Sequence, residues 1–172
     1  MFPVNWGDGT TTPSATPVTA IKANSGVTQV SAGYRHSCAI VQGGVKCWGS
    51  KAGGQTGKSL PKRGVTSIAA GGSHSCAVIN GGVKCWGYNV YGQLGNGTSG
   101  TANTISPSRV GLTSDTAVFS AGYYHVLERN VDGFLRAGGQ NTDGQVGDGT
   151  VVQRNSLVYI NCPTSTLANE EF

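Results

Sequence analysis

His36-Ser-Cys-Ala-Ile-Val-Gln-Gly-Gly-Val-Lys-Cys-Trp-Gly49 recurs as His74-Ser-Cys-Ala-Val-Ile-Asn-Gly-Gly-Val-Lys-Cys-Trp-Gly87, with differences at only three of the fourteen positions. The two copies start 38 residues apart. A fixed period of this size is typical of solenoids, propellers and arrays. The chain is therefore expected to be built from copies of one structural unit.

Each copy is predicted to form a β-hairpin. Asn80-Gly81 lies between two strand-forming runs and suits a type I′ turn, whose central residues both have positive φ. Counting outward from this turn places Cys76 opposite Cys85, and the same count places Cys38 opposite Cys47. Directly opposed residues on antiparallel strands lie ~4.5–5.5 Å apart at Cα, which a disulfide can span. We expect two disulfides; the alternatives are reduced core thiols and a zinc site, although the spacing does not match paired Cys-x-x-Cys knuckles.

A third, degraded copy supports the pairing. Residues 120–125 match residues 31–36, and Asp132-Gly133 stands at the hairpin turn. Leu127 replaces the first cysteine, and the second falls at Arg136 or Ala137 because one residue is inserted. Joint loss of both cysteines is what a bonded pair predicts.

The repeats divide one domain into units. The predicted boundaries are the tail of a partial repeat (1–12), three blades (13–57, 58–98 and 99–150), and a last segment (151–172) that holds the first strand of a further blade and a frayed end. The tail is assigned because Gly7-Asp8-Gly9-Thr10 matches Gly147-Asp148-Gly149-Thr150. Asp8 and Asp148 are expected to be turn formers rather than calcium ligands. Cys162 has no local mate and is either free or a bridge between chains.

The residues 30–39, 43–49 and 91–98 together resemble the regulator of chromosome condensation repeat. The resemblance covers nearly the whole chain and recurs three times. It implies an all-β fold, a β-propeller of four-stranded antiparallel blades with three blades in this chain. Family members serve nucleotide exchange on the small GTPase Ran, β-lactamase inhibition and ultraviolet sensing, so the fold does not fix the function. The variant with cysteines resembles bacterial extracytoplasmic members.

Three blades do not close a ring, since propellers need about 4–8. The partial repeat at residues 1–12 lacks the start of a blade, and the last segment, 151–172, lacks the end of one, so the two segments are complementary. We therefore expect a head-to-tail homodimer, in which a second chain completes the ring; a fragment of a larger propeller and an open monomer with capped edges are the alternatives.

Composition narrows the possible partners. Net charge is +4, with nine Lys or Arg against one acid in residues 1–114 and three against seven in residues 115–172. Opposite ends of opposite sign favour head-to-tail contact. The sequence contains no basic run with interleaved aromatics, so we expect no nucleic-acid partner. It contains no apolar run of about 18 residues, so we expect no membrane span. Two cysteine pairs favour an extracytoplasmic, secreted or surface location, with a reduced cytoplasmic protein as the alternative.

The three histidines, His36, His74 and His125, share one repeat position. A residue repeated in every unit is usually a structural hydrogen-bonding group, and an axial metal or general-base cluster is the alternative. No catalytic motif or cofactor-binding motif is present, so we expect no cofactor and no enzymatic activity. Trp48 and Trp86, at matching hairpin ends, are expected to pack between blades.

The tyrosines point to a binding surface. In an up-and-down four-stranded blade the first and third connections emerge on one face, and these connections hold five of the six tyrosines together with one arginine. Tyr and Arg are favoured in binding hot spots. We therefore predict a protein-binding module without enzymatic activity; the alternatives are a purely structural assembly module and an enzyme that uses the histidines. The predicted binding residues are Tyr34, Arg35, Tyr88, Tyr91, Tyr123 and Tyr124.

Overall fold

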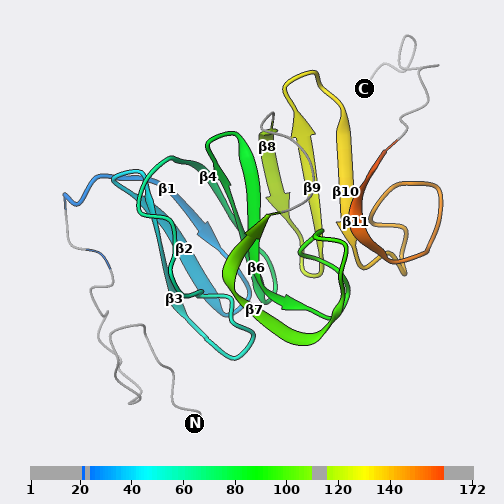
Figure 1. Ribbon diagram of the computed structural model, residues 1–172, viewed down its shortest axis with the longest axis horizontal. Helices are drawn as coiled ribbons and strands as arrows, with labels where there is room; N and C mark the ends of the chain where they lie inside the picture. Colours follow the sequence, from blue (N-terminus) through cyan, green and yellow to red (C-terminus); the bar gives the residue numbers. More distant parts are fainter. Residues whose placement is uncertain (1–20, 22–23, 110–115, 161–172) are drawn as a thin grey trace, which may run out of the picture.

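The computed structural model describes residue 21 and residues 24–109 and 116–160. This part of the chain is all-β, and its strands form three antiparallel sheets that lie side by side (Figure 1). The predicted tail (1–12), Cys162 and the last segment beyond residue 160 lie outside it. Among the described residues there is no helix of the length and apolarity needed to cross a membrane.

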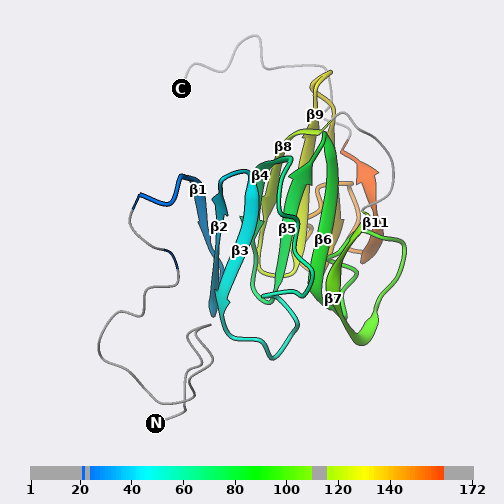
Figure 2. The same cartoon turned by 60° about the vertical axis from the view of Figure 1, so that its left-hand side comes forward.

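Each sheet is a meander, in which strands that follow one another in sequence pair with one another. The sheet orders are β1-β2-β3, β4-β5-β6-β7 and β8-β9-β10-β11. Figure 2 shows the sheets stacked one behind the next. The strands are β1 (Val27–Ala32), β2 (His36–Val41), β3 (Gly44–Gly49), β4 (Val65–Ala70), β5 (His74–Ile79), β6 (Gly82–Asn89), β7 (Gly100–Arg109), β8 (Thr116–Ala121), β9 (His125–Asn130), β10 (Leu135–Gly139) and β11 (Arg154–Tyr159).

The register predicted for the two cysteine hairpins is confirmed. Cys38 pairs with Cys47 and Cys76 with Cys85. The sulfur atoms lie 2.05 Å apart in the first pair and 2.08 Å apart in the second, at bonding distance. The turn between each pair has positive φ at both central residues, 51° and 78° for Asn80 and Gly81. The type I′ turn therefore fixes which sulfur atoms meet.

The third sheet clarifies the degraded repeat. Leu127 lies opposite Ala137, so Ala137 and not Arg136 stands at the position of the second cysteine. The prediction that residues 151–160 begin a further blade is not met. Residues 154–159 form β11, which pairs with β10 and completes the third sheet. The reason is that the outermost strand of a blade follows the closing loop in sequence, so the sequence repeat and the structural blade are out of phase.

The same offset applies to the second blade, where β7 lies beyond the predicted boundary at residue 98 and pairs with β6. The first sheet, in contrast, has three strands among the described residues rather than four. His74 follows His36 by 38 residues, whereas His125 follows His74 by 51. The shorter spacing leaves no room for a strand like β7. Among the described residues, the Val45 N–H donates to the Pro61 carbonyl at 2.8 Å along that edge.

Two apolar cores hold the sheets together. Trp86 has no exposed surface and donates its indole N–H to the carbonyl oxygen of Gln55 at 2.8 Å, which ties the second blade to the closing loop of the first. Trp48 is only half-buried. The core between the first two sheets comprises Cys38, Ile40, Val45, Val65, Ile68, Ala77 and Trp86. The core between the second and third comprises Ala69, Cys76, Val78, Val83, Cys85, Leu94, Phe119 and Val126.

A buried ion pair lies in the third sheet. Arg136 Nε is 2.9 Å from Glu128 Oε2, and both side chains are almost fully buried. The hydroxyl of Thr116 also donates to the Glu128 carboxylate, and the guanidinium lies over the ring of Tyr159 at 5.8 Å. A buried charge is costly unless it is paired and hydrogen-bonded, and Arg136 Nη2 donates to Glu128 Oε1 at 3.0 Å, which meets that condition.

Candidate protein-binding face

The connections after the first strand of each blade meet near one end of the sheets. Gly33, Gly71 and Gly122 each donate their backbone N–H to the histidine carbonyl three residues later, at 2.9 Å. Neighbouring connections are also joined: the Tyr34 N–H donates to the carbonyl of Gly71 at 3.2 Å, and the N–H of Gly72 donates to that of Tyr123 at 3.0 Å. Backbone hydrogen bonds therefore hold the tyrosines of different blades in a fixed arrangement.

Five tyrosines from the three blades form one continuous cluster of rings. Tyr34 and Tyr123 have ring centroids 5.4 Å apart, and Tyr123 and Tyr124 are 4.4 Å apart and edge-to-face. Tyr124 also lies 4.7 Å from Tyr91 and 6.2 Å from Tyr88. Such offset and edge contacts stabilise aromatic pairs. The structure thus brings together all five tyrosines that the sequence places in the predicted binding set.

This set, with Arg35, is called the tyrosine face below. Tyr34 is 66% exposed and Tyr123 47% exposed, so the cluster presents ring surface to solvent. Arg35 is exposed beside Tyr34 in the chain. Tyr88 lies at the end of β6 rather than in the connection after it, because this strand extends to Asn89. Desolvation, followed by the neighbouring Tyr123 hydroxyl, raises the pKa of Tyr124, so its hydroxyl stays protonated and able to donate at neutral pH.

A shallow hollow of about 280 Å³ lies beside Tyr34 and Tyr123. Its floor consists of Ala-Gly pairs from all three blades, which sequence reasoning did not single out. Glycine is required there: a Cβ on Gly71 would lie 2.2 Å from Cε1 of His74 and 2.5 Å from the carbonyl oxygen of Gly122. The hollow is lined by Ala32, Gly33, Tyr34, Ala70, Gly71, Gly72, Ala121, Gly122 and Tyr123.

The three histidines lie behind these glycines. His36 Nε2 is 2.8 Å from the hydroxyl oxygen of Ser75. Burial lowers the pKa of His36 to about 4; burial, followed by the charges of His36 and His125, lowers that of His74 to about 3. Both rings are neutral at pH 7. No group of three His, Cys, Asp or Glu within the described ranges is arranged to hold a metal ion.

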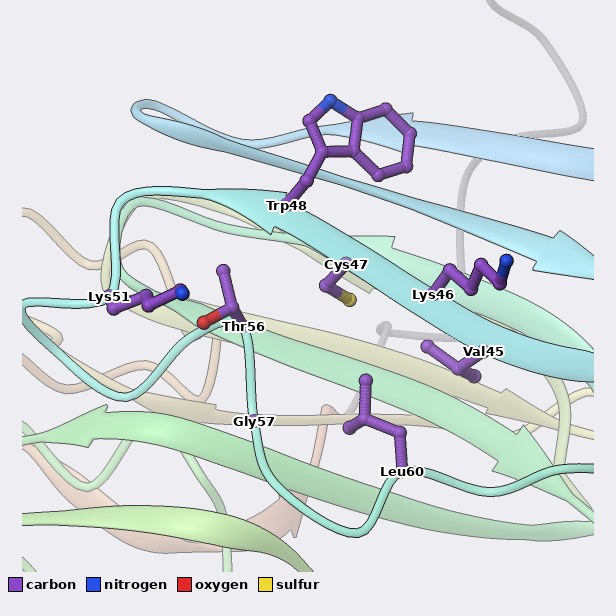
Figure 3. A pocket seen from close by; sticks show the side chains of 8 residues that line it. All are labelled: Val45, Lys46, Cys47, Trp48, Lys51, Thr56, Gly57 and Leu60. Carbon is purple, nitrogen blue, oxygen red and sulfur yellow. The ribbon is translucent and has the colours of Figure 1, made fainter. Parts of the chain in front are cut away.

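A larger groove of about 430 Å³ lies along the outer edge of β3 (Figure 3). It occupies the position that β7 fills beside β6, and its lining includes Lys46, Lys51 and Leu60. Figure 3 shows Trp48 on the opposite side of β3 from Leu60. Sequence reasoning missed the groove, although the short spacing between His36 and His74 signals it.

Models of the regulator of chromosome condensation (RCC1) repeat match residues 27–55 and 65–93, and a second model of the same repeat matches residues 80–127. The chain therefore belongs to the regulator of chromosome condensation repeat family. Comparison with curated proteins gives no significant match.

Solved structures agree with this fold. Human WBSCR16 superimposes with a TM-score of 0.68 at 25% identity, over 78% of this chain and 39% of that one. Prp20p from Saccharomyces cerevisiae, whose structure was described with its binding properties to Gsp1p and histones, gives a TM-score of 0.71 at 23% identity, over 91% of this chain and 43% of that one. Yeast RCC1 (Prp20) bound to Kap60 gives 0.69 at 23% identity, over 91% and 42%. The chain thus spans about two fifths of the length of these β-propellers.

Proposed function

We propose that this chain is a protein-binding β-propeller module without enzymatic activity, and that it binds a macromolecular partner through the tyrosine face. The observation that carries the proposal is the single ring cluster formed by tyrosines of three blades. A contiguous patch of half-exposed tyrosines offers large amphipathic area at a low cost in side-chain entropy. Protein binding in the related Prp20 structures supports the same class of function.

The location and organisation that we propose follow from the same features. The two cysteine pairs at bonding distance support an extracytoplasmic, secreted or surface location, where disulfides persist. The blades form one repeat domain, which a further chain or further blades would complete into a ring. The purely architectural alternative is favoured by one observation: Trp48, on the first sheet, is half-buried whereas its repeat equivalent Trp86 is fully buried.

The experiment removes ring area from the face without touching the cores. A partner is first captured by photo-crosslinking through an analogue placed at Tyr91, then purified, and its Kd is measured for the wild type and for Tyr34→Ala/Tyr88→Ala. We expect at least roughly tenfold weaker binding from the double variant, as for hot-spot aromatics. The matched control is Val131→Ala/Phe134→Ala, an exposed apolar pair away from the face, which should bind as the wild type does. Equal Kd values for the wild type and the tyrosine variant would refute the proposal.

A further inference from the structure

The junction between the first two blades has a defined polar seam. The carbonyl oxygen of Gln55 accepts the indole N–H of Trp86 at 2.8 Å and the hydroxyl of Ser75 at 2.9 Å. A hydroxyl has one hydrogen, so Ser75 in turn accepts from Nε2 of His36, 2.8 Å away. Ser75 and Trp86, which donate to the Gln55 carbonyl, are called the donor half of the seam, and the closing loop that holds this carbonyl is called the acceptor half. His36 lies beside the acceptor half and donates to Ser75.

The first sheet carries a second donor half. Ser37 and Trp48 pair across β2 and β3 in the same register as Ser75 and Trp86 across β5 and β6. Ser75 and Trp86 have no exposed surface, whereas Ser37 and Trp48 are half-buried. Among the described residues neither Ser37 nor Trp48 has a side-chain hydrogen bond. Within the part of the chain that the structure describes, these two donors thus lack the acceptor that their repeat equivalents have.

The third blade carries a second acceptor half. Its closing loop, 144–147, has the conformation of the loop 54–57: Gln145 Oε1 accepts the N–H of Asp143 at 2.9 Å, as Gln55 Oε1 accepts that of Gly53 at 2.8 Å. The hydrogen bond across each loop, between its last N–H and its first carbonyl, is 2.9 Å in both. The two loops therefore direct their glutamine carbonyls in the same way.

No described residue covers this loop as Trp86 covers the first one. A Cβ on Gly57 would lie 2.9 Å from Trp86 Nε1, whereas a Cβ on Gly147 would meet only the side chain of Ile160, at 3.5 Å, and one on Gly144 would meet no described atom within 4 Å. His125, at the repeat position of His36, is half-buried. Both halves of one seam are thus present in the chain, at opposite ends of the blade array.

Two segments have sequences that resemble the missing acceptor: the chain's own residues 4–10 and the third-blade loop of a second copy. All three described closing loops begin with a glycine of left-handed φ, 69–75°. Residues 4–10 place Val4 at that position, and a β-branched residue disfavours such a φ. Asn5 also replaces the glutamine. The loop of a second copy fits on both counts.

Charge favours the same occupant. Residues 24–109, which form the first two sheets, contain eight Lys or Arg and no Asp or Glu. Residues 116–160 of the third blade contain three Lys or Arg and four Asp or Glu. Asp148 is paired with Arg154, so among the described residues Asp143 is the acid beside the closing loop that has no ion pair. A strongly basic pair of sheets therefore faces a third blade with a net charge of −1, which favours the head-to-tail orientation.

We propose that the first sheet of one copy docks on the third sheet of a second copy, with Ser37 and Trp48 donating to the Gln145 carbonyl and His125 facing Ser37. The contact is heterologous, so it closes a ring where the rotation between copies permits and extends a filament otherwise. The residues that carry this contact are not those of the tyrosine face.

The test is solution mass by light scattering across increasing concentration. Every protein carries Cys162→Ser, so that a bridge between chains does not contribute. We expect the wild type to associate and Trp48→Glu to remain monomeric, because a charge at the seam meets no partner. Val131→Glu, an exposed apolar residue at a hairpin tip, is the matched control and should associate as the wild type does.

A more conservative variant distinguishes a loss of association at the seam from a loss of folding. Ser37→Ala/Trp48→Phe removes both donors and keeps the shape, so we expect association roughly tenfold weaker with an unchanged circular dichroism spectrum. A monomeric wild type at about 100 μM, or association that is indifferent to both seam variants, overturns the proposal. A monomeric wild type that associates only after residues 1–12 are deleted would assign the site to the chain's own segment and would also overturn it.

Discussion

Trp86 donates its indole N–H to the carbonyl oxygen of Gln55 at 2.8 Å across the boundary between two blades. Replacing Trp86 by Phe removes the donor and part of a fully buried ring, so we expect a loss of about 2–3 kcal/mol in the free energy of unfolding. Urea denaturation of the dilute protein measures it. Trp48→Phe is the control, since Trp48 is half-buried and makes no such bond to a described residue; equal losses in the two variants would contradict the asymmetry.

The ion pair between Glu128 and Arg136 yields a second prediction. Both side chains are almost fully buried, so Arg136→Met leaves an unpaired buried carboxylate. Breaking such a pair costs about 3–5 kcal/mol, which urea denaturation would detect. Arg129→Met, at an exposed position of the same sheet, should change stability by less than about 0.5 kcal/mol. A small effect at Arg136 would mean that water reaches the pair.

The buried histidines predict acid sensitivity. Their pKa values fall from 6.5 to about 4 for His36 and about 3 for His74, with burial as the main cause. The unfolded chain therefore takes up protons below pH 6.5 while the folded chain does not. Stability should be full above pH 7 and should fall as the pH drops from 6.5 to 4, by up to about 1.4 kcal/mol per pH unit for each histidine.

Urea denaturation at pH 7, 6 and 5 measures this slope, in a window where most carboxylates stay ionised. Burial also lowers the pKa of His125, so three histidines contribute to the slope. His74→Asn should therefore reduce the slope by about a third to a half, whatever it does to stability at pH 7, because only titrating groups contribute to it. An unchanged slope in His74→Asn would show that another group titrates.

The two disulfides should differ in accessibility to a reductant. Cys76 and Cys85 have no exposed surface, whereas Cys47 is half-buried beside the groove along β3. Thiol exchange requires access of the attacking thiolate to sulfur. With limiting dithiothreitol, alkylation followed by mass spectrometry should find Cys38 and Cys47 modified first. Simultaneous modification of both pairs would show that reduction requires opening of the whole array.

The hairpin register was predictable because a two-residue Asn-Gly turn fixes which residues of the two strands lie opposite one another. That register determines the cysteine partners. The tyrosine cluster was predictable in its members but not in its contacts, since ring distances depend on how the connections bond across blades. Tyr34 and Tyr123 meet only because their backbones are hydrogen-bonded through neighbouring glycines.

The outermost strands were not predictable from the repeat alone. Residues 100–109 and 154–159 share no motif with one another, and backbone pairing at a sheet edge demands little of the side chains. The prediction that residues 151–160 open a new blade was wrong for this reason. The buried ion pair was also missed, because its partners replace Ala77 and Lys84 of the preceding blade and no local pattern marks them.

The polar seam also has a consequence for how such arrays lengthen. The third blade has Val126 and Gly138 where the second has Ser75 and Trp86, so the two junctions differ in chemistry. A tandem duplication of the second blade would place a new Ser-Trp pair against the carbonyl of Gln93 and so reproduce an existing contact. A duplicate of the third would offer its neighbour no donor. Duplication of the second blade would therefore preserve the polar seam, whereas duplication of the third would repeat a junction that lacks it.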